Sequence, residues 1–247
     1  MNVVKKEKEE ILNNPFVALI SLTLITLPLT YKYNSISLIL LVVFSLYQLR
    51  KKQYYFQKNL ILPVLLYVLM ALSLFWTIDS KETTKALLKE LSLVLIPLCF
   101  FLNRPLLDDE KNKVIQYFSY FFFGYALFYL IKAIFRYSIF KDINVFFYHE
   151  LVTFDLNAIH VSIYNSIAFF WFFLKKQKLL VDKIAIFTLL LMLFLLSSKN
   201  IIIVFLILLL ACFFMESKIK FSKSKIYITM LLIVALGLLF YGKIKIH

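Results

Sequence analysis

The sequence predicts an all-α membrane protein, a bundle of about nine transmembrane helices. The chain of 247 residues is 62% hydrophobic, has a mean hydropathy of +0.84 and contains only 3 glycines. A soluble core of this length cannot absorb so much apolar surface, whereas a bilayer can. The apolar runs have the length of helices that cross about 30 Å of hydrocarbon. They lack the two-residue alternation of a membrane β-barrel.

The apolar runs give the predicted spans in chain order. The first is a retained span, because no A-x-A-like cleavage site follows the charged start MNVVKKEKEE. We expect Pro97 to kink the fourth span. We treat residues 1–247 as a single transmembrane domain. The nine spans cover residues 15–31, 35–49, 60–76, 86–103, 114–135, 160–174, 184–198, 200–215 and 226–242.

The basic residues indicate the orientation of these spans. When alternate loops are assigned to opposite sides, one side receives 18 of the 28 lysines and arginines. The positive-inside rule makes that side cytoplasmic, so the N-terminus lies inside and the C-terminus outside. The net charge of +14 then reflects topology and contact with anionic membrane lipids, and we expect no nucleic-acid partner. The predicted inside loops are residues 50–59, 103–113, 175–183 and 216–225, and the N-terminal Lys5, Lys6 and Lys8 lie on the same side.

The longest predicted outer loop contains the stretch FFYHELVTFDLNAIHVSIYN, residues 146–165. It gathers His149, Glu150, Asp155 and His160 between two apolar runs. An acid beside a histidine in a partly desolvated pocket is suited to general base catalysis near neutral pH. Loop capping or an interfacial histidine is the alternative, and spacing alone favours it. The zinc pattern H-E-x-x-H fails at Thr153, so we expect no metal site.

Three cations lie at the predicted outer ends of other spans. Lys132 and Arg136 are four residues apart, hence on one helical face, and suit a phosphate or pyrophosphate group. Lys199 is the only charge in the short turn between the seventh and eighth spans. Anchoring of these side chains at the membrane interface is the alternative for all three.

The segment WTIDSKETTKALLKELS also carries charges toward the outer face. Asp79 and Glu82 have the spacing of a helix start with Asp79 as its N-cap. Lys89 and Glu90 follow two or three turns later, inside the fourth predicted span. Charges at that depth either reach back to the interface or face a wet cavity.

Three stretches, taken together and in this order, resemble a known family. WTIDSKETTKALLKELSLVLIPL, YHELVTFDLNAIHVSIYNS and LLSSKNIII are similar to segments of bacterial O-antigen ligase and O-antigen polymerase-like membrane proteins. The resemblance implies a membrane-embedded glycosyltransferase. Such a protein transfers a glycan from undecaprenyl pyrophosphate to a lipid or glycan acceptor, at the outer face of the bacterial cytoplasmic (inner) membrane. It implies no nucleotide sugar, metal or other cofactor.

The resemblance also implies roles for particular residues. His149 and Glu150 are the catalytic candidates, and the candidates for binding the pyrophosphate-linked substrate are Lys132, Arg136, His160 and Lys199. The chain departs from the family at His160, where tyrosine is more usual, and it ends before the family's C-terminal outer loop and last spans. We therefore expect either a fragment or early-stopped chain or a member with partial function, which binds the lipid-linked glycan but transfers it poorly or not at all. A small multi-span transport or accessory protein without catalysis is the alternative, although the related halves of a transporter are missing.

Overall fold

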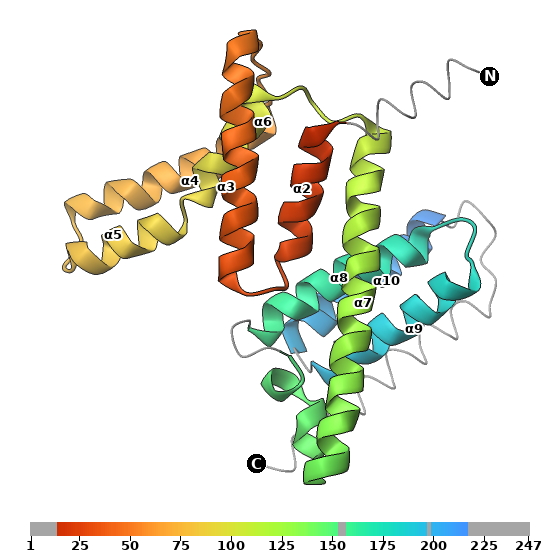
Figure 1. The fold of residues 1–247 in the computed structure, drawn as a ribbon. Coiled ribbons are helices and arrows are strands. Elements are labelled where there is room, and N and C mark those ends of the chain that lie inside the picture. Colours follow the sequence, from red (N-terminus) through yellow and green to blue (C-terminus); the bar gives the residue numbers. More distant parts are fainter. Residues whose placement is uncertain (1–13, 153–156, 197–198, 217–247) are drawn as a thin grey trace, which may run out of the picture. The chain divides into compact units, whose positions relative to one another are not determined.

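The computed structural model describes residues 14–152, 157–196 and 199–216, and within these ranges the chain is helical without any strand (Figure 1). This confirms the predicted all-α class. The chain divides into two compact units, residues 1–196 and 197–247, which we describe separately. Helices α2 to α9 belong to the first unit, and α10 (Lys199–Glu216) belongs to the second.

Helices α2 (Pro15–Thr26) and α3 (Tyr31–Tyr47) pack side by side as a hairpin (Figure 1). Asn14 caps α2, with its side chain accepting the backbone N–H of Phe16 at 3.1 Å. At about 1.5 Å per residue the 12 residues of α2 extend only about 18 Å. The helix ends at Thr26, before the predicted end at residue 31, because Pro28 cannot donate the next backbone hydrogen bond.

The fourth predicted span is two helices rather than one kinked helix. Helix α5 (Ser80–Lys89) ends at Glu90, and α6 (Ser92–Leu102) begins after Leu91. Pro97 lies inside α6, and the chain breaks nearly two helical turns before it, so the kink expected at Pro97 stays a prediction. Asp79 caps α5 as predicted, accepting the backbone N–H groups of Lys81 and Glu82 at 3.0 Å. Helix α4 (Ile61–Leu72) lies alongside α5 and packs on α6 (Figure 1).

Helix α7 (Asp108–Phe140) is the longest of the described elements, and α2, α8 (Ala158–Leu174) and α9 (Leu180–Leu195) all pack against it. Its 33 residues extend about 50 Å, well beyond the predicted span of 114–135. The helix begins in the polar segment DDEKNK. Its three acids lie in the first turn, where their negative charge interacts favourably with the positive end of the helix dipole. Between α8 and α9, the buried Asn165 donates to the carbonyl of Leu189 at 2.6 Å.

Within the described ranges, three helices are long and apolar enough to cross a membrane, which is the character of a membrane protein. The three runs, with their short 3₁₀ extensions, are Tyr31–Lys51, Lys58–Phe75 and Asp108–Phe140. Helices occupy most of each of the first eight predicted spans. The ninth, residues 226–242, lies outside the described residues. The number of spans therefore stays a prediction.

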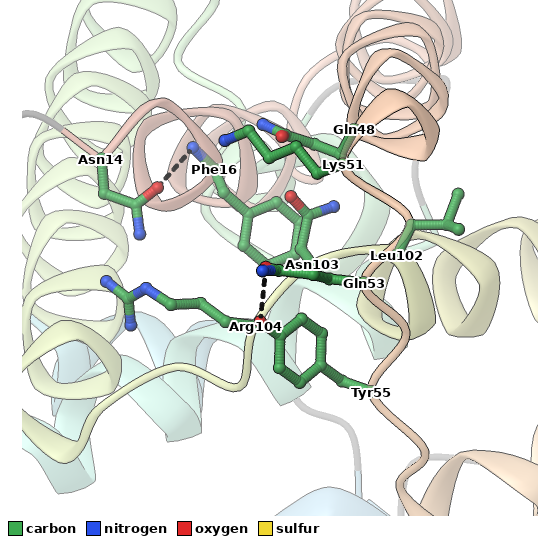
Figure 2. A pocket seen from close by; sticks show the side chains of 9 residues that line it. All are labelled: Asn14, Phe16, Gln48, Lys51, Gln53, Tyr55, Leu102, Asn103 and Arg104. Atoms are coloured by element: carbon green, nitrogen blue, oxygen red, sulfur yellow. Dashed lines mark hydrogen bonds between the residues drawn. The ribbon is translucent and has the colours of Figure 1, made fainter.

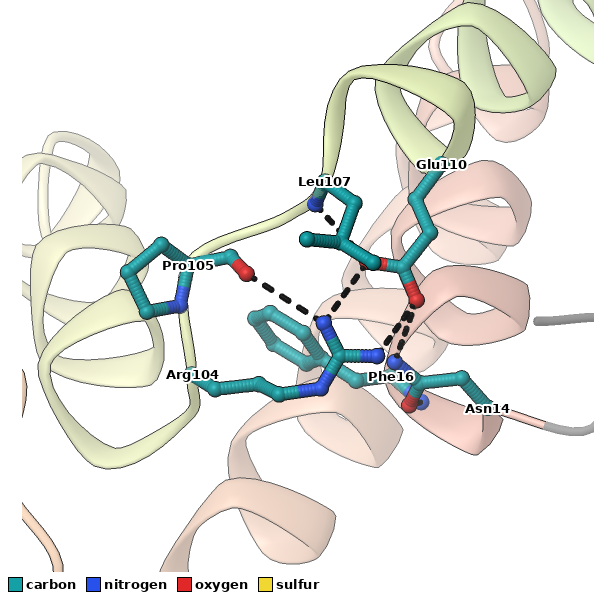
Figure 3. A network of polar contacts seen from close by, with 6 residues as sticks. All are labelled: Asn14, Phe16, Arg104, Pro105, Leu107 and Glu110. Carbon is teal, nitrogen blue, oxygen red and sulfur yellow. Dashed lines mark hydrogen bonds and ion pairs between the residues drawn. The ribbon is translucent and has the colours of Figure 1, made fainter. Parts of the chain in front are cut away.

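Segments from three predicted inside regions meet at one end of the first unit. The N-terminus of α2, the 3₁₀ turn η1 (Gln48–Lys51) after α3, and the α6–α7 junction surround a small pocket (Figure 2). Beside it lies Glu110, in the first turn of α7 and fully buried (Figure 3). Its carboxylate accepts hydrogen bonds from both terminal nitrogens of Arg104, at 2.7 and 3.0 Å, and from the side-chain amide of Asn14 at 3.0 Å. It also accepts the backbone N–H of Leu107 at 2.9 Å, so one acid joins α2, the junction and α7.

The junction between α8 and α9 is built in the same way. Asp182, fully buried in the first turn of α9, accepts the Lys175 ammonium and the backbone N–H of Leu179, both at 2.8 Å. Tyr120 of α7 donates to its second oxygen at 3.2 Å. Burial alone would raise the pKa of Asp182, but these hydrogen bonds and the Lys175 charge outweigh it and lower the pKa. The hydrogen bond to Asp182 raises the pKa of Lys175.

Candidate functional site

The loop after α7 holds the two catalytic candidates that the sequence predicts, His149 and Glu150. Lys141 ends the helix in a left-handed conformation, with φ 54°. Two short 3₁₀ turns follow, η4 (Ile143–Phe146) and η5 (Tyr148–Glu150). Val145, Leu151 and Val152 are buried and anchor the loop. Residues 153–156, including the predicted Asp155, lie outside the described residues.

Arg136 and Glu150 are the two predicted site residues that the structure brings into contact. One terminal nitrogen of Arg136 donates to the carboxylate of Glu150 at 2.7 Å, and the other donates to the backbone carbonyl of Glu150 at 2.6 Å. The side chains are 34% and 47% exposed, so water screens the pair. The Arg136 guanidinium, which the sequence predicts to bind a pyrophosphate, therefore binds Glu150 of the loop in this structure.

Three other predicted site residues, Lys132 of α7, His149 of the loop and His160 of α8, are exposed. Lys132 lies one helical turn before Arg136, as the sequence predicts, with its ammonium 5.4 Å from the centre of the Tyr129 ring. The His149 ring packs edge-on against Tyr148 at 4.2 Å between ring centres. His160 lies in the first turn of α8, which Asn157 caps.

Lys199 begins α10 in the second unit, so the prediction that it shares a site with Arg136 stays a prediction. The roles of all six predicted residues are likewise not tested by this geometry. Among the described residues, no group of three or more His, Cys, Asp or Glu side chains is arranged to hold a metal ion.

A cavity of about 800 Å³ lies between residues 31–43 of α3 and the break separating α5 from α6. Lys89 and Glu90 both line it. These are the two charges that the sequence places either at the interface or in a wet cavity. The break explains their position, because Glu90 ends α5, donating its N–H to Ala86, and its carbonyl accepts the N–H of Leu93 to begin the next helix.

The lining of this cavity changes from polar to apolar along α3. Tyr31, Asn34 and Ser35 line it at the start of the helix, and Lys89 and Glu90 line it from the α5–α6 break. The next residues of α3 on this face are the apolar Leu38, Ile39, Val42 and Val43. From residue 31 to residue 43 the helix rises about 18 Å. The cavity thus has a polar end and an apolar wall, which suits a molecule with a polar head and a hydrocarbon chain.

Sequence reasoning missed Tyr31, Asn34 and Ser35 as site residues. The available signal was the polar stretch YKYNS, which interrupts two apolar runs. A polar stretch of this kind also forms any ordinary turn between spans, so its pattern does not identify a cavity. Only the packing of α3 beside the α5–α6 break shows which polar residues line the same cavity.

The chain was compared with protein-family models, with curated proteins and with solved structures, and none of the three comparisons gave a match.

Proposed function

We propose that this chain acts in the assembly of a bacterial surface polysaccharide, by binding a lipid-carrier-linked glycan at the outer face of the cytoplasmic membrane. The observation that carries the proposal is the cavity beside α3, which combines Lys89, Glu90 and polar side chains with an apolar wall. A polyprenyl pyrophosphate carrier has the matching chemistry, an anionic head on a long hydrocarbon chain. The first segment of the family resemblance, residues 76–98, supplies both Lys89 and Glu90.

In this proposal the glycan is transferred to a lipid or glycan acceptor in one displacement. The acceptor hydroxyl attacks the anomeric carbon of the glycan, the bond from that carbon to the pyrophosphate oxygen breaks, and undecaprenyl pyrophosphate leaves. Glu150 or His149 takes the proton of the acceptor hydroxyl. The cations Lys132 and Lys199 stabilise the charge of the leaving pyrophosphate. Arg136 holds Glu150 in position through the two contacts described above.

The experiment measures binding of undecaprenyl pyrophosphate to the purified chain in lipid nanodiscs. Lys89→Met removes the charge that lines the cavity while keeping a long side chain. A hydrogen bond to a charged group contributes about 1.5–3 kcal/mol, so we expect roughly tenfold weaker binding or more. Lys85→Met is the matched control, one turn away on α5, because Lys85 pairs with Glu82 at 2.6 Å and does not line the cavity.

If Lys89→Met and Lys85→Met weaken binding equally, the cavity is not the binding site. If binding does not saturate, undecaprenyl pyrophosphate is not the ligand. A separate assay follows transfer of glycan from the carrier to a lipid acceptor. Transfer that is lost in Glu150→Gln while carrier binding is retained would support the catalytic role of the loop. Transfer that survives both Glu150→Gln and His149→Ala would refute that role.

A further inference from the structure

The small pocket at the other end of α3 is rich in hydrogen-bond donors. Its volume is about 150 Å³, far more than the 10–15 Å³ that one water needs. Among the described residues its lining contains no carboxylate (Figure 2). Its polar lining consists of two cations and four carboxamides on Lys51, Arg104, Asn14, Gln48, Gln53 and Asn103, with the hydroxyl of Tyr55 beside them.

The charge of the residues that line this pocket suits an anion with a single negative charge. Arg104 is neutralised by its ion pair with the buried Glu110, at 2.7 Å. Lys51 is exposed and forms no ion pair within 4.0 Å among the described residues. Asn103 is held by its own bonds to Ser45 and the Cys99 carbonyl, at 2.9 and 2.8 Å, so it shapes the wall. The net charge of the lining is thus about one positive charge, which suits a phosphodiester better than a dianionic phosphate.

An apolar groove continues from the same place. It has a volume of about 300 Å³ and lies between α4 and α6, lined by residues such as Val64, Leu98 and Phe101. Tyr55 lines both the pocket and the groove. The backbone N–H of Tyr55 donates to the carbonyl of Phe101 at 2.8 Å, which fixes the junction between them on α6.

We infer that the pocket and the groove together bind one anionic phospholipid, with its phosphodiester beside Lys51 and an acyl chain along α4 and α6. Basic pockets between transmembrane helices are typical sites for anionic headgroups. The acyl chain has a continuous apolar path from Tyr55, because α4 buries none of its side chains. This site is separate from the proposed glycan-carrier cavity, since Lys51 and Tyr31 stand at opposite ends of the same helical run.

The test uses native mass spectrometry of the delipidated full chain, titrated separately with dioleoyl phosphatidylglycerol, dioleoyl phosphatidylcholine and inorganic phosphate. We expect phosphatidylglycerol to bind several-fold more tightly than phosphatidylcholine. One basic residue at a membrane surface contributes about 1 kcal/mol, so Lys51→Gln should weaken phosphatidylglycerol binding about fivefold. Lys52→Gln is the matched control, because it removes the same charge from the next residue, which does not line the pocket.

Val64→Phe tests the acyl-chain groove by filling it with a larger side chain. We expect it to weaken phosphatidylglycerol binding without changing the helical content by circular dichroism. Equal losses for Lys51→Gln and Lys52→Gln would overturn the headgroup assignment, and unchanged binding in Val64→Phe would overturn the groove. Inorganic phosphate that competes as well as the lipid would show a free-anion site instead.

Discussion

The ion pair between Arg104 and Glu110 gives the sharpest stability prediction. Glu110 is fully buried and accepts four hydrogen bonds, two of them from Arg104, whose side chain is 44% exposed. Arg104→Ala leaves a buried carboxylate with only Asn14 and the Leu107 N–H. Removing one partner of a buried pair costs about 3–5 kcal/mol. Because Arg104 is partly in solvent, we expect a loss of about 2–3 kcal/mol in the free energy of unfolding.

The assay is equilibrium unfolding in mixed micelles, followed by circular dichroism. Adding Glu110→Leu to Arg104→Ala should recover at least half of the loss, because the double variant no longer buries an unpaired charge. The matched control is Lys111→Ala, which breaks the exposed pair with Asp108 at 2.8 Å and should cause no measurable change. Similar losses for Arg104→Ala and Lys111→Ala, or a double variant less stable than Arg104→Ala, would refute the argument.

Two further predictions concern the other ion pairs. The pKa of Asp182 is lowered in the folded chain, so its stabilising contribution is present above the pKa of an unfolded aspartate, about 3.9, and is lost as pH falls below about 4 toward the folded pKa. Unfolding between pH 7 and pH 3 should therefore show a larger acid loss in the native chain than in Asp182→Asn, and parallel curves would contradict this. Arg136→Ala should increase hydrogen exchange in residues 145–152, since it removes both contacts to Glu150. Arg136→Lys should restore protection only in part because the fork is lost, and full restoration would show that charge alone holds the loop.

The sequence by itself determined the helical class and the apolar segments. Hydropathy is a sum over local residues, so spans such as 60–76 are readable without knowing their neighbours. Capping is also local, because the donors that Asp79 satisfies lie two and three residues ahead of it. The contact of Arg136 with Glu150 joins two residues that the sequence singled out separately, Arg136 for binding pyrophosphate and Glu150 for catalysis.

Only the tertiary structure decided which polar residues meet and where the fourth apolar run breaks. Pro97 was the visible signal for a kink, but the break at Glu90 and Leu91 follows from α5 lying along α4 while α6 packs on α3. The pairing of Arg104 with Glu110 needs the α6–α7 junction to fold back on itself. The bond from Asn14 to Glu110 spans 96 residues. Contacts of that kind depend on packing between elements, and no local pattern of charge or hydropathy encodes them.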